Sequence, residues 1–120
     1  KAFDASGRAN AGHALETVVL NELERRGAEV GYVKTGTGLE VDFLVRYPAA
    51  GEELIQVCAD LSTPEARSRE LRALTEAAKL HPHAARRLLV LDRDALMQVS
   101  APEVTIQPAY DWLLSVPQTG

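Results

Sequence analysis

The sequence contains a single cysteine, Cys58, which excludes an internal disulfide and any zinc site built from several cysteines. It also lacks an apolar run long enough to span a bilayer, and no segment has the pattern of a signal peptide. These absences are typical of a reducing compartment. We therefore expect a cytoplasmic protein that has no membrane partner.

Basic residues are outnumbered, with 13 Lys and Arg against 17 Asp and Glu and a net charge of −4. This balance argues against a surface that clamps nucleic acid everywhere, although it permits a local basic groove. The glycines at Gly36 and Gly38 do not form a phosphate-binding loop, because no Gly-x-x-x-x-Gly-Lys-Ser/Thr pattern occurs. Any nucleotide hydrolysis that depends on such a loop must therefore belong to another part of the protein.

The length of 120 residues and a hydrophobic content of 46% predict one domain with a substantial core. We divide it into a loose lead-in (1–9), a core (10–93) and a C-terminal extension (94–120). The chain begins at Lys1 without an initiator Met, which we interpret as a fragment of a longer chain.

Hydrophobic periodicity and capping residues predict the order of the secondary structure. A helix is expected from Asn10 or Ala11 to Arg26, with Gly27 at the C′ position, and a second from a cap at Ser62 or Thr63 to about His81. Strands are expected at 28–35, 39–47, 53–60, 87–92 and 104–106, and a last helix at 108–115. This order predicts an α/β fold with a central mixed sheet flanked by helices. The helix after the third strand would be a right-handed crossover if the strands that it joins are parallel.

The strand at 39–47 alternates in polarity, which places Leu39, Val41, Phe43 and Val45 on one face. The side chains of Ile55, Val57, Leu89 and Leu91 should also be mostly buried. Leu15, Val18, Leu71 and Leu74 of the helices should pack on the sheet. The other face of the first strand carries Glu40, Asp42, Leu44 and Arg46, and one face of the next carries Gln56, Cys58 and Asp60. So many polar groups between apolar ones indicate a functional site or the remains of one.

Several short motifs resemble the PD-(D/E)xK nuclease superfamily, and more closely the nuclease-like C-terminal domain of a family of prokaryotic AAA-type ATPases. The matching runs are GHALE at 12–16, the residues at 26–27 and 33–35, and GLEVDF at 38–43. The last of these is the specific part, and the match covers roughly residues 8 to 93. The resemblance implies a restriction-endonuclease-like αβββαβ core.

The resemblance also implies roles for four residues. In active members, an acid on the helix and acids on two strands hold magnesium, and a lysine two positions later assists the attacking water. Glu16 and Asp42 match, but Gln56 and Cys58 stand where the second acid and the lysine should be. An amide is a neutral, weaker magnesium ligand, and a thiol supplies no positive charge. We therefore expect Glu16, Asp42, Gln56 and Cys58 to form a degenerate constellation whose metal ligands, if any, are Glu16, Asp42 and Gln56.

Each residue also has a plainer interpretation. Asp42 and Glu40 can be the solvent-facing side of a half-exposed strand, and Cys58 a small buried hydrophobe. The arginines and lysine of the second long helix can line a nucleic-acid groove or form a solvated face with ion pairs. Lys34 or Lys79 can replace the missing lysine from another element.

These observations leave three hypotheses. The first is a catalytically inactive nuclease-like accessory domain of an AAA-type ATPase, which binds nucleic acid or protein and needs no cofactor. The second is an active deoxyribonuclease that uses magnesium. The third is an interaction domain that contacts no nucleic acid. The partners expected are DNA, the protein's own N-terminal ATPase domain and a second copy of the chain.

Overall fold

The computed structural model describes residues 2–59, 61, 63–91, 93 and 101–115. The elements are α1 (Ala2–Arg25), β1 (Glu29–Lys34), β2 (Glu40–Tyr47), β3 (Gly51–Cys58), α2 (Pro64–Leu80), β4 (Ala85–Val90), β5 (Thr105–Pro108) and α3 (Ala109–Leu114). The strands form one sheet in the order β1-β2-β3-β4-β5. The first three pair antiparallel, whereas β4 and β5 run parallel to β3. The predicted α/β fold with a mixed sheet flanked by helices is confirmed.

Local signals set the ends of the two long helices. Gly27 has a φ of +79°, and the bond from Ala28 N–H to the Leu23 carbonyl closes a Schellman motif after α1. Thr63 caps α2 by accepting a hydrogen bond from the Ala66 N–H at 3.0 Å. Both caps agree with the sequence prediction.

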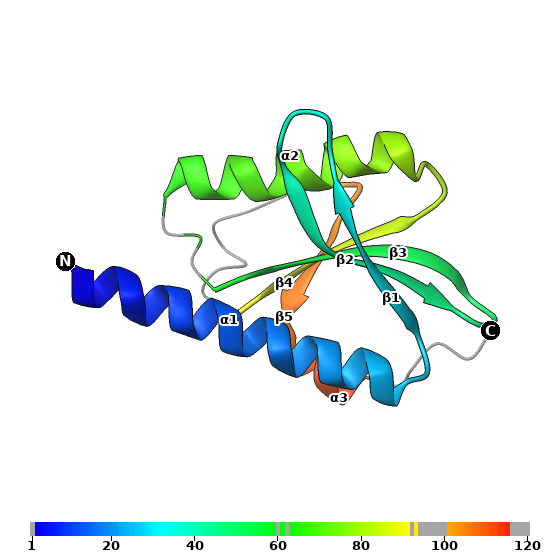
Figure 1. The fold of residues 1–120 in the computed structure, drawn as a ribbon, viewed down its shortest axis with the longest axis horizontal. Coiled ribbons are helices and arrows are strands. Elements are labelled where there is room, and N and C mark those ends of the chain that lie inside the picture. The colour runs from blue at the N-terminus through cyan, green and yellow to red at the C-terminus, as the bar shows by residue number, and fades with distance from the viewer. Residues whose placement is uncertain (1, 60, 62, 92, 94–100, 116–120) are drawn as a thin grey trace.

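The helices form two layers, one on each face of the sheet (Figure 1). Beneath α2, a cluster includes Leu54, Leu74 and Leu88, all fully buried. On the other face, α1 and α3 cover a second cluster that includes Val19, Leu23 and Trp112. Among the described residues, apolar side chains therefore cover both faces of the sheet at its centre.

The predicted alternation along β2 is wrong in its first half. Leu39 and Val41 belong to the cluster beneath α2, whereas Phe43 and Val45 belong to the cluster beneath α1. The cause is a β-bulge: the interval from Gly31 to Val33 on β1 faces the longer interval from Leu44 to Val41 on β2. An extra residue in one strand reverses the facing of everything beyond it.

Three further expectations need correction. The expected loose lead-in is helical from Ala2 on, because α1 begins there. Val18 is exposed, since the buried stripe of α1 runs one position later through Val19 and Leu23. Leu91 is exposed because β4 ends at Val90. Asp60, Ser62 and Asp92 lie outside the described residues, as does much of the predicted extension at 94–120.

Phe43 provides a test of this core. We expect Phe43→Ala to lower the free energy of unfolding by about 3–5 kcal/mol, because the ring is buried beneath α1 and its loss leaves a cavity. Tyr32→Ala is the matched control, since Tyr32 is 86% exposed on β1. Chemical denaturation measures both. A loss below about 1 kcal/mol for Phe43→Ala would contradict the assigned face.

Candidate functional site

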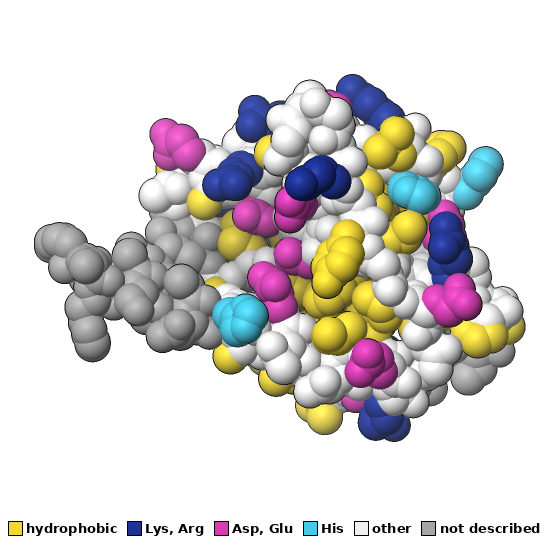
Figure 2. All heavy atoms as spheres, viewed as in Figure 1, with side chains coloured by type: hydrophobic (Ala, Val, Ile, Leu, Met, Phe, Trp, Pro, Cys, Tyr) yellow, Lys and Arg dark blue, Asp and Glu magenta, His cyan; other side chains and the backbone are white. Residues whose placement is uncertain are grey.

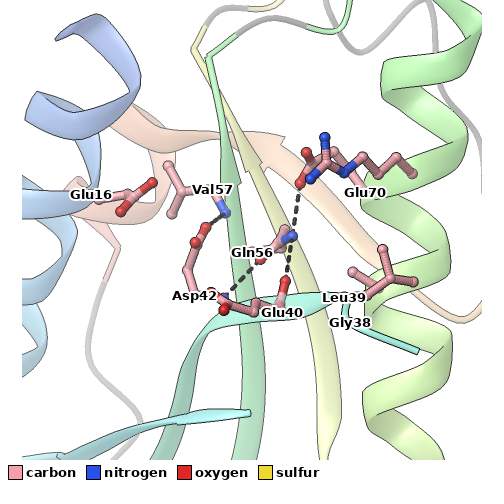
Figure 3. A pocket seen from close by; sticks show the side chains of 10 residues that line it. Glu16, Gly38, Leu39, Glu40, Asp42, Gln56, Val57 and Glu70 are labelled. Atoms are coloured by element: carbon pink, nitrogen blue, oxygen red, sulfur yellow. Dashed lines mark hydrogen bonds between the residues drawn. The ribbon is translucent and has the colours of Figure 1, made fainter. Parts of the chain in front are cut away.

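A cavity of about 400 Å³ opens where β2 and β3 stop pairing. Figure 2 shows acidic side chains gathered near the middle of this face, with basic side chains toward α2. In Figure 3, Glu16 from α1 and Glu70 from α2 lie on opposite sides of the cavity, with Asp42 and Gln56 between them. The structure therefore brings Glu16, Asp42 and Gln56 together, as predicted.

Gln56 connects the two strands through its side chain. Its Oε1 accepts a hydrogen bond from the Asp42 backbone N–H at 2.8 Å, and its Nε2 donates to the Glu40 carbonyl at 3.3 Å. The amide therefore satisfies one donor and one acceptor of β2, as a peptide group of a neighbouring strand would. Its Nε2 also donates to Glu70 Oε1 at 2.8 Å, which ties α2 to the same point.

Asp42 completes this arrangement from the opposite strand. Its Oδ2 accepts a hydrogen bond from the Val57 backbone N–H at 2.8 Å. Each strand thus sends one side chain to a backbone group of the other, and these bonds replace the ladder beyond the Phe43–Ile55 pair. Because Gln56 is buried, an unpaired backbone group here would be costly, and both polar side chains prevent that cost.

The surroundings favour the neutral form of Asp42. Its pKa is raised to about 7, chiefly because burial disfavours the charged carboxylate. The bond from Val57 lowers the pKa, and the nearby charges of Glu16, Glu70 and Glu40 raise it. The pKa of Glu70 is also raised, first by burial, against the lowering effect of the Gln56 amide. In this cavity, ionisation of one carboxyl group therefore makes ionisation of its neighbours less favourable.

Cys58 does not join the constellation, and this prediction is wrong. Its side chain packs against the cluster beneath α2 and does not line the cavity. The interpretation of Cys58 as a small apolar side chain describes its position better. Asp60, which shares its predicted face, lies outside the described residues.

Sequence reasoning missed Glu70, which lines the cavity. Arg69 also lines it and is one of the basic residues of α2 for which the sequence left a groove or a solvated face open. A signal for Glu70 existed: it precedes the buried Ala73 and Leu74 by one helical turn, so it extends the inner stripe of α2. Glu40 also lines the cavity, although it is exposed and pairs with Lys34 at 3.6 Å. Neither Lys34 nor Lys79 lines it, and Lys79 pairs with Glu76 at 3.0 Å.

The residues present do not fit the magnesium site that the resemblance implies. The oxygen of Gln56 that would ligate a metal already accepts a hydrogen bond from Asp42, and one oxygen of Asp42 is bound to Val57. Among the described residues, no group of three or more His, Cys, Asp or Glu side chains is placed to hold a metal ion. Of the three implied ligands, Gln56 and Asp42 are thus both engaged with backbone groups.

Exchanging Gln56 for glutamate should destabilise the fold. We expect Gln56→Glu to cost about 1–3 kcal/mol at pH 8, because a carboxylate cannot donate to the Glu40 carbonyl or to Glu70. Gln107→Glu is the matched control, since Gln107 accepts a hydrogen bond from Arg87 and a carboxylate preserves that contact. Urea unfolding at pH 8 compares the two variants. Equal costs would contradict the bridging role of Gln56.

Asp42 should make stability depend on pH in metal-free buffer. Its folded pKa of about 7 lies above the ordinary value of 3.8 for an aspartate side chain, so the folded state binds more protons between these values. This contribution is complete below about pH 4 and is lost as the pH rises to 7. Asp42→Asn should abolish that fall, gaining at least about 1.4 kcal/mol relative to the native chain between pH 4 and 8. Parallel pH profiles for the two proteins would overturn the prediction.

Among the described residues, no helix combines the length and apolar character needed to cross a membrane. Comparisons of the chain with protein-family models, with curated proteins and with solved structures found no match. The physical basis for a function is therefore the cavity. It combines an amide that bridges two strands with several carboxyl groups, and no lysine is found among the described residues that line it.

Proposed function

We propose that this chain is a nuclease-like accessory domain of an AAA-type ATPase that binds a macromolecule without hydrolysing nucleic acid. The order of a helix, three antiparallel strands, a helix and a parallel strand supports the restriction-endonuclease-like core that the motifs implied. The meeting of Glu16 and Asp42 in one cavity is a second point of agreement. The partners in this proposal are DNA or protein, including the ATPase part and a second copy.

The hydrogen bonds of Gln56 carry the proposal. The residue occupies the position of a metal-binding acid, but its amide is engaged with the backbone of β2 and with Glu70. A group that holds two strands and a helix together cannot turn to a metal without leaving buried partners unpaired. The position has thus acquired a structural role that opposes the catalytic one.

The missing lysine adds a second obstacle to hydrolysis. A positioned charge that stabilises the transition state contributes on the order of 10²–10³ in rate. Arg69 is the only basic residue among the described residues that line the cavity, but Arg is not interchangeable with Lys as an activator of water. Weak metal retention and a lost cation together leave little catalysis.

The charges around the cavity bear on what is bound. The carboxyl groups of the cavity repel phosphate, so a nucleic acid would have to contact α2, where Arg69 and Arg72 line an adjoining hollow. A protein partner could use the second hollow beside the cavity, which includes Tyr32, Phe43 and Glu16. Tyr32 is 86% exposed there, and tyrosine is one of the residue types that are enriched at protein interfaces.

An active magnesium-dependent deoxyribonuclease is the second candidate. The observation in its favour is the approach of Glu16, Glu40, Asp42 and Glu70 to one cavity, since carboxylates concentrate a hard cation. This candidate requires Gln56 to release the backbone of β2. Magnesium-dependent chemistry therefore separates the two candidates directly.

We expect no significant cleavage of single- or double-stranded DNA by this chain with magnesium or manganese, measured on labelled DNA by gel electrophoresis. The reason is the engaged amide of Gln56 and the missing lysine. Asp42→Asn is the control for contaminating nucleases. Cleavage by the native chain that Asp42→Asn abolishes would replace the first candidate by the second.

Binding is tested separately by fluorescence anisotropy of labelled DNA over a range of salt concentrations. If DNA is the partner, the double variant Arg69→Gln/Arg72→Gln should reduce the slope of log K against log salt by about 2. Arg46→Gln is the control, since Arg46 pairs with Glu52 away from the cavity. No affinity at low salt would favour the protein-binding form. A Walker A loop encoded upstream of Lys1 would support the proposal that this domain belongs to an ATPase. If no such loop is encoded there, that element of the proposal is wrong.

A further inference from the structure

A second polar cavity, of about 180 Å³, lies at the opposite end of β2 and β3 from the acidic cavity. Its lining includes Tyr47 at the end of β2, Glu53 near the start of β3 and Arg87 on β4. Arg26, which follows α1, and Trp112 of α3 close it from the helix layer. The two cavities share no lining residue.

Arg26 is held rigidly in this cavity. Only 4% of its side chain is exposed, and its guanidinium lies 4.4 Å from the centre of the Trp112 ring. Its Nε donates to Glu22 at 2.7 Å and its Nη2 to the Trp112 carbonyl at 2.9 Å. Its Nη1 makes no hydrogen bond within the described part of the chain. One donor edge of a fixed, charged group therefore remains unused.

Arg87 is fixed in the same way from the sheet. Its Nε donates to Glu53 at 2.7 Å, and its Nη1 donates to Gln107 Oε1. Glu53 is buried and also accepts a hydrogen bond from the Tyr47 hydroxyl at 3.2 Å. Neither Arg87 Nη2 nor Gln107 Nε2 has a hydrogen-bond partner among the described residues. Two more donors are thus available beside that of Arg26.

The charges that line the cavity favour an anion. Two guanidinium groups and one carboxylate give a net charge of +1, in a chain whose net charge is −4. Tyr47 adds no negative charge near neutral pH, because burial and the neighbouring Glu53 raise its pKa to about 12. Glu22 lies outside the lining but pairs with Arg26 at 2.7 Å, so it offsets part of this positive charge. Placed guanidinium donors are the usual protein ligands of phosphate oxygens.

We propose that the cavity between Arg26, Arg87 and Gln107 binds a phosphate group, either free or at the end of a nucleic acid. The volume of about 180 Å³ equals that of about six water molecules, which is sufficient for a phosphate with part of its hydration shell. This site is independent of the acidic cavity and of the function proposed for it.

Isothermal titration calorimetry with inorganic phosphate tests the proposal on the 120-residue chain at pH 7.5 and constant ionic strength. Calorimetry is preferable to a shift in melting temperature, because phosphate stabilises proteins even without binding to them. We expect saturable binding of one phosphate. If no saturable heat is seen up to about 10 mM phosphate, the dissociation constant is too high for a specific site. That result would overturn the proposal.

The decisive variant is Gln107→Glu, which keeps an acceptor for Arg87 while cancelling the net positive charge of the cavity. It should fold normally and bind phosphate at least about tenfold more weakly, because charge-assisted bonds to the anion are opposed. Arg87→Lys, which keeps the positive charge but loses the fixed set of guanidinium donors, should also weaken binding. Arg46→Gln removes an arginine that pairs with a carboxylate outside the cavity and should change nothing.

Competition then distinguishes the two sources of phosphate. A short oligonucleotide with a 5′-phosphate that competes with inorganic phosphate, when its unphosphorylated form does not, assigns the site to nucleic-acid ends. If neither oligonucleotide competes with inorganic phosphate, the site is assigned to free phosphate. Equal phosphate binding by the native chain, Gln107→Glu and Arg87→Lys would place the anion elsewhere and refute this site.

Discussion

The bridge formed by the Gln56 side chain is the constraint on which the arrangement of the acidic cavity depends. Strands β2 and β3 separate after the Phe43–Ile55 pair, and the amide supplies the donor and acceptor that the missing ladder would have supplied. Asp42 reciprocates toward Val57. Because unpaired buried backbone groups are costly, this pair of side chains holds the separated strands together, and the Gln56–Glu70 bond links α2 to them.

The same constraint explains why acidic side chains share one cavity. The strands separate here, and the space between them brings Glu16 and Asp42 together. The Gln56 amide spans this space and is engaged with the backbone of β2. The raised pKa of Asp42 is a further consequence, since its carboxyl is buried among other acids. Arg69 is the only basic residue among the described residues that line the cavity.

The two polar cavities differ in how their charges are balanced. In the acidic cavity, carboxyl groups meet a neutral amide, and burial together with the neighbouring acids raises the pKa values of Asp42 and Glu70. At the other end of the sheet, Glu53 is matched by Arg87, and Arg26 is matched by Glu22 and stacked on Trp112. Both lie where strands end, because the centre of the sheet is covered by apolar side chains on each face.

The amino-acid sequence by itself determined the element order and the caps at Thr63 and Gly27, since periodicity and capping act over a few residues. Tertiary structure alone decided the bulge in β2, because register depends on the neighbouring strand. It also decided that Gln56 binds backbone and that Cys58 joins the core. Those roles depend on which strand and helix lie opposite, and residues distant in the sequence supply them.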